Sequence, residues 1–264
     1  MPASPETVTL YVVSLAQEGR RVSTISRALA TISQRHRTMG FPSPTSASIV
    51  KETLRGIRRH LGVHQAQKCP LLSEQLRAIV ATTPDDLSGS RDRAILLLGF
   101  AMAARRSELV ALDVTDVAFT PEGAVITIRR SKTDQDGAGR RIGIPYGSSP
   151  ETCPVRALHA WLTAAGITTG PLFRGVGRWG RISSERLTDR AVARTIKRHV
   201  AAVGLDPRAY AGHSLRSGLA TSAARAGRSE RSIMATTGHK SVEMVRRYIR
   251  AGNLFQDCAA AGLL

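Results

Sequence analysis

The chain has 264 residues, with 38 Lys and Arg against 20 Asp and Glu, so its formal net charge is +18. This excess argues against an ordinary acidic or neutral metabolic enzyme and favours a polyanionic partner, nucleic acid first, because clustered cations release the counterions condensed on it. Since 42% of the residues are hydrophobic, the chain can bury a sizeable core and is not a disordered basic tail.

Two further classes of protein are disfavoured. The most apolar run, residues 94–104, is too short to span a bilayer, and the N-terminus carries no charged leader followed by an apolar stretch. We therefore expect a cytoplasmic protein with no membrane partner. The three cysteines are far apart and lack CxxC spacing, so neither a disulfide nor a metal site is expected from them.

The first part of the chain is predicted to be helical. Apolar residues recur at helical spacing over residues 6–17, 22–39 and 48–61. The prolines of the GFPSP segment interrupt that period and predict a loop at residues 40–44. Residues 62–70 have no apolar period and predict a linker. The chain is therefore expected to divide into a helical domain of residues 1–65 and a larger domain of residues 66–264.

The second part is predicted to be mostly helical, with one small β element. Residues 124–129 alternate as in a strand, and residues 141–145 can pair with them across the polar DQDGAG turn. Gly227 and Gly238 lie where helix C-terminal caps belong. Helices are predicted over residues 73–81, 90–104, 154–165, 188–203, 214–226, 229–236 and 241–250. The expected fold class is mainly α with a small β-hairpin or sheet.

Two cations of the second domain follow buried elements. Arg105 comes just after the helix at residues 90–104, and Glu108, three residues later, can share a helical face with it and hold its guanidinium. Lys132 comes directly after the predicted strand, where a turn would hold its ammonium at the sheet edge. Taken singly, each of these is an ordinary structural feature.

Two histidines, an arginine and a tyrosine occupy helix ends later in the chain. His213 and Arg216, in GHSLRS, stand at the start of a helix, whose free N–H groups suit a phosphate. His239 is expected to be exposed in the gap between two short helices, and Tyr248 follows nine residues later on the second of them. Together with the preceding cations, they indicate one site.

In this order the residues resemble the signature of the tyrosine recombinase (phage integrase) family, and the resemblance covers most of the chain. That signature is an Arg, a hairpin Lys, HxxR, a His or Trp, and a Tyr nine residues later. Glu108 matches the acidic residue of the family's first arginine box. The stretches VSTISRALATISQRHRTMGFPSP and VRRYIR are similar to Cre-like site-specific recombinases. The six matched residues are Arg105, Lys132, His213, Arg216, His239 and Tyr248.

The resemblance implies a SAM-like helical core-binding domain, here lacking its first helix, followed by a catalytic domain. It also implies DNA recombination or integration through a 3′-phosphotyrosine and a free 5′-hydroxyl, in a bacterial or phage-encoded protein of the nucleoid or a mobile element. The residue types suit this chemistry, because fixed cations and hydrogen-bond donors can stabilise a phosphorane without a metal ion. No metal, nucleotide or other cofactor is expected.

Each residue of the set has an expected role. Tyr248 is the candidate nucleophile, and His213 is the candidate acceptor of its proton. Arg105 and Arg216 can clamp the nonbridging oxygens, while His239 can donate to one of them. Lys132 is the candidate acid for the departing 5′-hydroxyl.

Contacts beyond this set follow only from the resemblance. It implies that the helix at residues 22–39 enters a major groove of double-stranded DNA, with Ser23, Thr24 and Arg27 at its DNA-facing start; the alternative is a merely solvated helix end. The partly apolar tail after Tyr248, residues 249–264, would dock on a neighbouring subunit in a DNA-bound tetramer, or else pack on its own domain.

Three alternatives stay open at this stage. Tyr210, close to His213, is the rival nucleophile. A type IB topoisomerase uses a similar residue set and relaxes supercoils without exchanging strands. A non-catalytic or defective DNA-binding remnant of the same fold is the third alternative.

Overall fold

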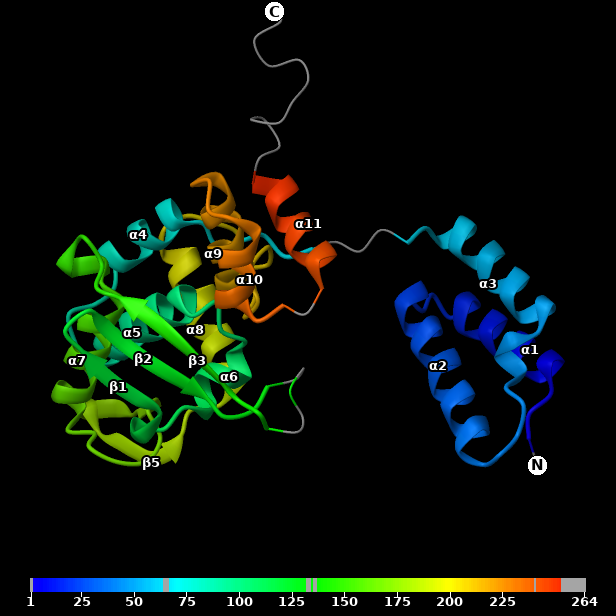
Figure 1. Ribbon diagram of the computed structural model, residues 1–264, viewed down its shortest axis with the longest axis horizontal. Coiled ribbons are helices and arrows are strands. Elements are labelled where there is room, and N and C mark those ends of the chain that lie inside the picture. The colour runs from blue at the N-terminus through cyan, green and yellow to red at the C-terminus, as the bar shows by residue number, and fades with distance from the viewer. Residues whose placement is uncertain (1, 64–66, 132–133, 135–136, 240, 253–264) are drawn as a thin grey trace, which may run out of the picture. The chain divides into compact units, whose positions relative to one another are not determined.

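The structure is a computed structural model that describes residues 2–63, 67–131, 134, 137–239 and 241–252 (Figure 1). The chain divides into two compact units, Met1–Gln67 and Lys68–Leu264. No helix within the described ranges combines the length and the apolar character needed to cross a membrane.

The first unit is helical. The Ser4 side chain accepts a hydrogen bond from the backbone N–H of Thr7, which caps the first helix. Residues from all three α-helices close a small core, with Val8 and Val12 packed near Ile25. The helical ranges predicted from apolar spacing agree with the observed ones to within one residue. The elements are α1 (Pro5–Gln17), α2 (Val22–Thr38), η1 (Pro44–Ser46) and α3 (Ser48–Leu61).

The second unit is built around one buried helix, α5 (Leu87–Ala101), which contacts most of the other α-helices of this unit. The sequence pattern places this helix three residues too late. Asp86 caps it by accepting from the N–H of Gly89, and Ala103 ends the helical run with a positive φ of 47°. Helices before and after it are α4 (Ser73–Ala81), α6 (Arg106–Ala111), η2 (Val114–Asp116), η3 (Pro150–Thr152), α7 (Pro154–Ala165) and α8 (Asp189–Ala202).

A three-stranded antiparallel sheet lies against these helices, and its order is β1-β2-β3. The predicted pairing of the second and third strands is confirmed, with Ile126 opposite Ile142 and both side chains in the core. The first strand and a separate two-stranded sheet are not among the predicted elements, because their strands are only three to five residues long and none of their residues is buried. The strands are β1 (Val117–Thr120), β2 (Gly123–Ile128), β3 (Arg140–Pro145), β4 (Arg174–Val176) and β5 (Ile182–Arg186), and the short helix η4 (Arg178–Gly180) lies between the last two.

Three helices close the described part of the chain: α9 (Ser214–Arg225), α10 (Glu230–Thr237) and α11 (Val242–Gly252). They pack on one another through a small cluster of their own that includes Ala220, Ile233 and Val245. Gly238 ends α10 in the left-handed conformation, with φ 64°, as its place in the sequence predicts. Because α11 lies against α9, its tyrosine is brought to the beginning of that helix.

Candidate active site

Tyr248 and His213 meet at the junction of α9 and α11. Nε2 of His213 lies 2.9 Å from the hydroxyl oxygen of Tyr248, although the two residues are 35 apart in the sequence. The His239 ring also packs against the Tyr248 ring, with the two ring centroids 5.7 Å apart and the ring planes inclined by 35°. Two histidines therefore contact the one tyrosine, and the hydrogen bond defines a direct path for its proton.

Arg216 lies in the first turn of α9 and is almost completely buried, at 1% exposure. Its Nη1 donates to the carbonyl of Ala103 at 2.8 Å, which fixes the guanidinium. Among the described residues, nothing accepts a hydrogen bond from its Nη2. Burial, with a contribution from the nearby Arg105, lowers the pKa of Arg216 to about 10. A buried donor without a protein acceptor is costly, so this nitrogen is suited to an incoming anion.

Arg105 stands just before α6 rather than on it, which corrects the expectation that it shares a helical face with Glu108. Its φ and ψ of −70° and 144° are extended, and its backbone N–H donates to Glu108 Oε2 at 3.0 Å. The guanidinium also donates to Glu108 Oε1. The carboxylate, at the third helical position, thus caps the helix and orients the arginine at the same time.

His239 follows Gly238 and is partly buried rather than exposed. Its Nδ1 lies 2.8 Å from the hydroxyl of Thr237, and that hydroxyl has a carbonyl acceptor of its own, Ile233, at 2.7 Å. Since the threonine proton is used by Ile233, the histidine Nδ1–H donates to the threonine oxygen. Among the described residues, Nε2 at the opposite edge of the ring has no hydrogen-bond partner.

Arg140 belongs to the same cluster, and sequence reasoning missed it. Its Nη1 donates to the carbonyl of Thr236 at 2.8 Å, and its Nη2 lies 3.5 Å from Glu108 Oε2. The signal that could have found it is strand alternation, because Arg140 shares a strand face with the core residues Ile142 and Ile144. The described charges of the cluster are thus three arginines against the carboxylate of Glu108.

This concentration of positive charge shifts the pKa values of the titratable groups. Burial, aided by Arg216 and Arg105, lowers the pKa of His213. The pKa of His239 is lowered to about 4, by burial first and then by the neighbouring cations. Burial raises the pKa of Tyr248, against the pull of Arg216. At neutral pH His213 is therefore unprotonated, and Tyr248 keeps its proton until a base accepts it.

The other sequence candidates are Lys132, Tyr210, Ser23, Thr24 and Arg27. Lys132 is outside the described residues. Tyr210 is buried, at 5% exposure, and its hydroxyl accepts from Gln75 at 3.0 Å, which leaves it poorly placed as a nucleophile. Ser23, Thr24 and Arg27 lie in the first turns of α2, in the other unit, with Ser23 and Arg27 exposed.

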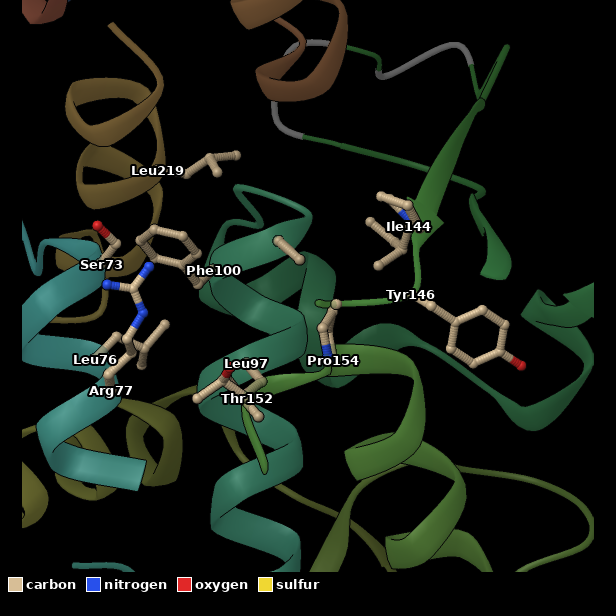
Figure 2. Close-up of a pocket in the computed structure, with 13 residues that line it drawn as sticks. Ser73, Leu76, Arg77, Leu97, Phe100, Ile144, Tyr146, Thr152, Pro154 and Leu219 are labelled. Carbon is tan, nitrogen blue, oxygen red and sulfur yellow. The ribbon is translucent and has the colours of Figure 1, made fainter. Parts of the chain in front are cut away.

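An apolar depression of about 340 Å³ lies apart from the cluster and is lined by none of its residues. Figure 2 shows Leu76 and Arg77 of α4 on one side of it and Ile144 and Tyr146, at the end of β3, on the other. Within the described ranges, no group of three His, Cys, Asp or Glu side chains is placed to hold a metal ion.

Comparison with known proteins identifies the class. Residues 70–253, most of the second unit, match the model of the phage integrase family. The chain belongs to this family, and its class is that of a tyrosine-type site-specific recombinase, as the sequence resemblance implies.

Particular relatives cover nearly the whole chain. An integrase/recombinase XerD homologue of Selenomonas ruminantium is 43% identical over 263 residues, which are 98% of this chain and 77% of that protein. The recombinase Cre of Escherichia phage P1 is 28% identical over 94% of this chain and 76% of its own length. The XerD homologue is thus more similar to this chain than Cre is.

Solved structures show the same fold. The integrase of the Tn1549 transposon, in complex with a circular-intermediate DNA, superposes with a TM-score of 0.68 at 15% identity, over 93% of this chain and 80% of its own. The XerH recombinase bound to a palindromic difH substrate gives a TM-score of 0.61 at 17% identity, over 96% and 72%. The mainly helical fold class with small antiparallel sheets is confirmed.

Proposed function

We propose that this recombinase cuts and rejoins DNA strands through a 3′-phosphotyrosyl intermediate, with Tyr248 as the nucleophile. The observation that carries the proposal is the 2.9 Å hydrogen bond between Tyr248 and Nε2 of His213. This bond connects the Tyr248 hydroxyl, which must lose its proton, with a ring nitrogen of His213 that can accept it. The family membership of the chain supports the same assignment.

In the proposed step the tyrosine oxygen attacks the scissile phosphorus and the bond to the 5′ oxygen breaks. The tyrosine proton passes to His213, and the departing 5′ oxygen takes a proton to become a hydroxyl. Lys132 is the proposed donor of that second proton; in the sequence it lies between β2 and β3. The phosphodiester energy is kept in the phosphotyrosine, so reversal of the step rejoins a strand.

The developing negative charge falls on the nonbridging oxygens, where fixed donors stabilise it. Arg105 and Arg216 are the proposed clamp, supported by the unpartnered Nη2 of Arg216 and by the carboxylate that orients Arg105. His239 is the proposed third donor through Nε2. A bound phosphate offsets the surrounding cations and so favours the protonated form of this ring.

The two units have different proposed roles. Residues 1–65 form the core DNA-binding domain and residues 66–264 the catalytic domain. The first turns of α2, with Ser23, Thr24 and Arg27, are the proposed groove contacts on double-stranded DNA. Exposed cations on α3, such as Arg55 and Arg58, add phosphate contacts.

Exchange between two duplexes requires a cleaved phosphate in each of the participating arms. The proposed active species is therefore a tetramer assembled on DNA, with the segment after Tyr248 docked on a neighbouring subunit; residues 253–264 of that segment lie outside the described part of the chain. The proposed place of action is the nucleoid of a bacterial cytoplasm.

Covalent capture tests the proposal. Purified protein is incubated with nicked duplexes that tile the DNA flanking its gene, and the products are resolved on a denaturing gel. The nick lets the 5′-hydroxyl fragment escape, so a protein–DNA adduct accumulates. An adduct is expected with the wild type and with Tyr210→Phe, and none with Tyr248→Phe. Relaxation of supercoiled plasmid without exchange of strands would instead indicate a topoisomerase.

A further inference from the structure

We propose that Arg140 is a positioning residue of the active site, which holds the His239 loop and the Arg105–Glu108 pair in one arrangement. The role rests on the proposed function, since it concerns the residues assigned there to the phosphate. None of the sequence motifs includes Arg140, and its assignment comes from its contacts alone.

The strand register directs Arg140 toward the cluster. It is the first residue of β3, opposite Ile128, and it shares a strand face with Ile142 and Ile144, which are buried. Its neighbour Arg141 is on the other face and is exposed. The Arg140 side chain therefore lies on the strand face that packs toward the site, whereas the side chain of Arg141 lies on the opposite, exposed face.

The first contact of Arg140 secures the loop that carries His239. Its Nη1 donates to the carbonyl of Thr236 at 2.8 Å, in the last turn of α10. Carbonyls in the last turn of a helix lack a partner within it, and a cation there also favours the helix dipole. Three residues later the chain reaches His239, so the hydrogen bond fixes the base of its loop.

Gly238 shows how close this approach is. A Cβ at this position would lie 2.6 Å from Nη1 of Arg140, and the backbone there has a φ of 64°. A side chain would have to displace either the arginine or the turn. The absence of a side chain at Gly238 thus allows Arg140 to reach Thr236 beside the histidine.

The second contact joins Arg140 to the other side of the site. Its Nη2 lies 3.5 Å from Oε2 of Glu108, the oxygen that also accepts from the backbone N–H of Arg105. The Glu108 side chain is buried, at 1% exposure, and its other oxygen accepts from the Arg105 guanidinium. One arginine of β3 thus connects the α6 cap, which orients Arg105, with the end of α10.

The test compares Arg140→Gln and Arg140→Lys with Arg141→Gln, the matched change on the exposed face of the same strand. Cleavage is measured as adduct formation on the nicked duplex, next to DNA affinity and melting temperature. Arg140→Gln is expected to slow cleavage about 100-fold, the cost of a small misplacement of catalytic groups, with DNA affinity little changed. Arg140→Lys keeps the charge but cannot span both acceptors, so it too is slow, while Arg141→Gln cleaves like the wild type.

A double-mutant cycle separates positioning from a general loss of folding. If Arg140 acts through His239, the loss caused by Arg140→Gln shrinks markedly once His239 is already alanine. Full retention of the loss in the His239→Ala background would overturn the proposal. Wild-type cleavage by Arg140→Gln or by Arg140→Lys would overturn it as well.

A second readout needs no DNA cleavage and stays informative even if the proposed reaction fails. Among the described residues, Arg216, Arg105, His213 and Arg140 act on the His239 ring as positive or titratable neighbours, and the Tyr248 ring packs against it. Removing the charge of Arg140 should raise the pH at which this ring titrates, as followed by NMR of ¹⁵N-histidine, and Arg141→Gln should leave it unchanged. An unaltered His239 titration in Arg140→Gln would overturn the placement of Arg140, whereas absence of any adduct in the wild type would refute the proposed function alone.

Discussion

Glu108 holds the arginine cluster together, and replacing it with glutamine tests that directly. The carboxylate side chain is 1% exposed and pairs with Arg105 and Arg140, whose side chains are 20% and 22% exposed. Glu108→Gln keeps the volume and removes the negative charge. The two guanidinium groups, together with the buried Arg216, then face one another without compensation.

The cost follows from the burial of the group that is changed. Removing one partner of a buried ion pair costs about 3–5 kcal/mol, because the remaining charge is left desolvated. Here the remaining arginines are one-fifth exposed and can recover some hydration, so the lower end, about 3 kcal/mol, applies. For a unit of this size each kcal/mol lowers the melting temperature by about 2–4 °C, so a fall of about 6–12 °C is expected.

The assay is thermal unfolding followed by circular dichroism, at low salt and without DNA. Glu122→Gln is the control, since Glu122 is an exposed residue in the turn between β1 and β2. It should melt within about 2 °C of the wild type, in line with the small effects of surface substitutions. A Glu108→Gln protein that melts with the control would refute the view that this carboxylate neutralises the cluster.

Three further predictions concern His213, His239 and the turn at Gly238 that precedes His239. His213 must be unprotonated to accept the tyrosine proton, and its pKa is lowered from 6.5. Cleavage should therefore be lost only as the pH falls below 6.5 and should be constant above neutrality. A rate that falls from pH 7 to pH 8 in single-turnover assays would contradict this. Thr237→Val removes the acceptor of the His239 Nδ1–H and should slow cleavage about tenfold, while Thr237→Ser restores it; equal rates for the two variants would refute the role of the hydroxyl. Gly238→Ala places a side chain on a backbone in the left-handed conformation, against Arg140. It should lower the free energy of unfolding, measured by denaturant titration, by about 1–3 kcal/mol. An unchanged free energy of unfolding would show that the turn adapts.

The sequence predicts most helices because their apolar spacing is regular and their caps are local. The misplaced start of α5 has a physical cause: this helix is buried on nearly every side, so it has no polar face whose period would mark where it begins. The short helix α6 is not among the predicted ranges either. The strand β1 and the pair β4–β5 are short and bury none of their residues, and tertiary contacts determine them. Local pattern carries no signal for such elements.

The candidate site divides in the same way. Motif spacing is sufficient to select Arg105, His213, Arg216, His239 and Tyr248, and the fold brings these five into one cluster. Spacing gives no indication of Arg140 or Thr237, because their roles come from contacts with residues of other elements or across a turn. The charge distribution of the site depends on such contacts as much as on the motif.

The central claim is that Tyr248 carries the DNA during the reaction. The most direct measurement is to digest the covalent adduct with a protease and a nuclease and to identify the nucleotide-bearing peptide by mass spectrometry. The account predicts a single modified residue, Tyr248, linked to a 3′-phosphate. A nucleotide found on Tyr210, on another side chain, or through a 5′-phosphate would contradict it.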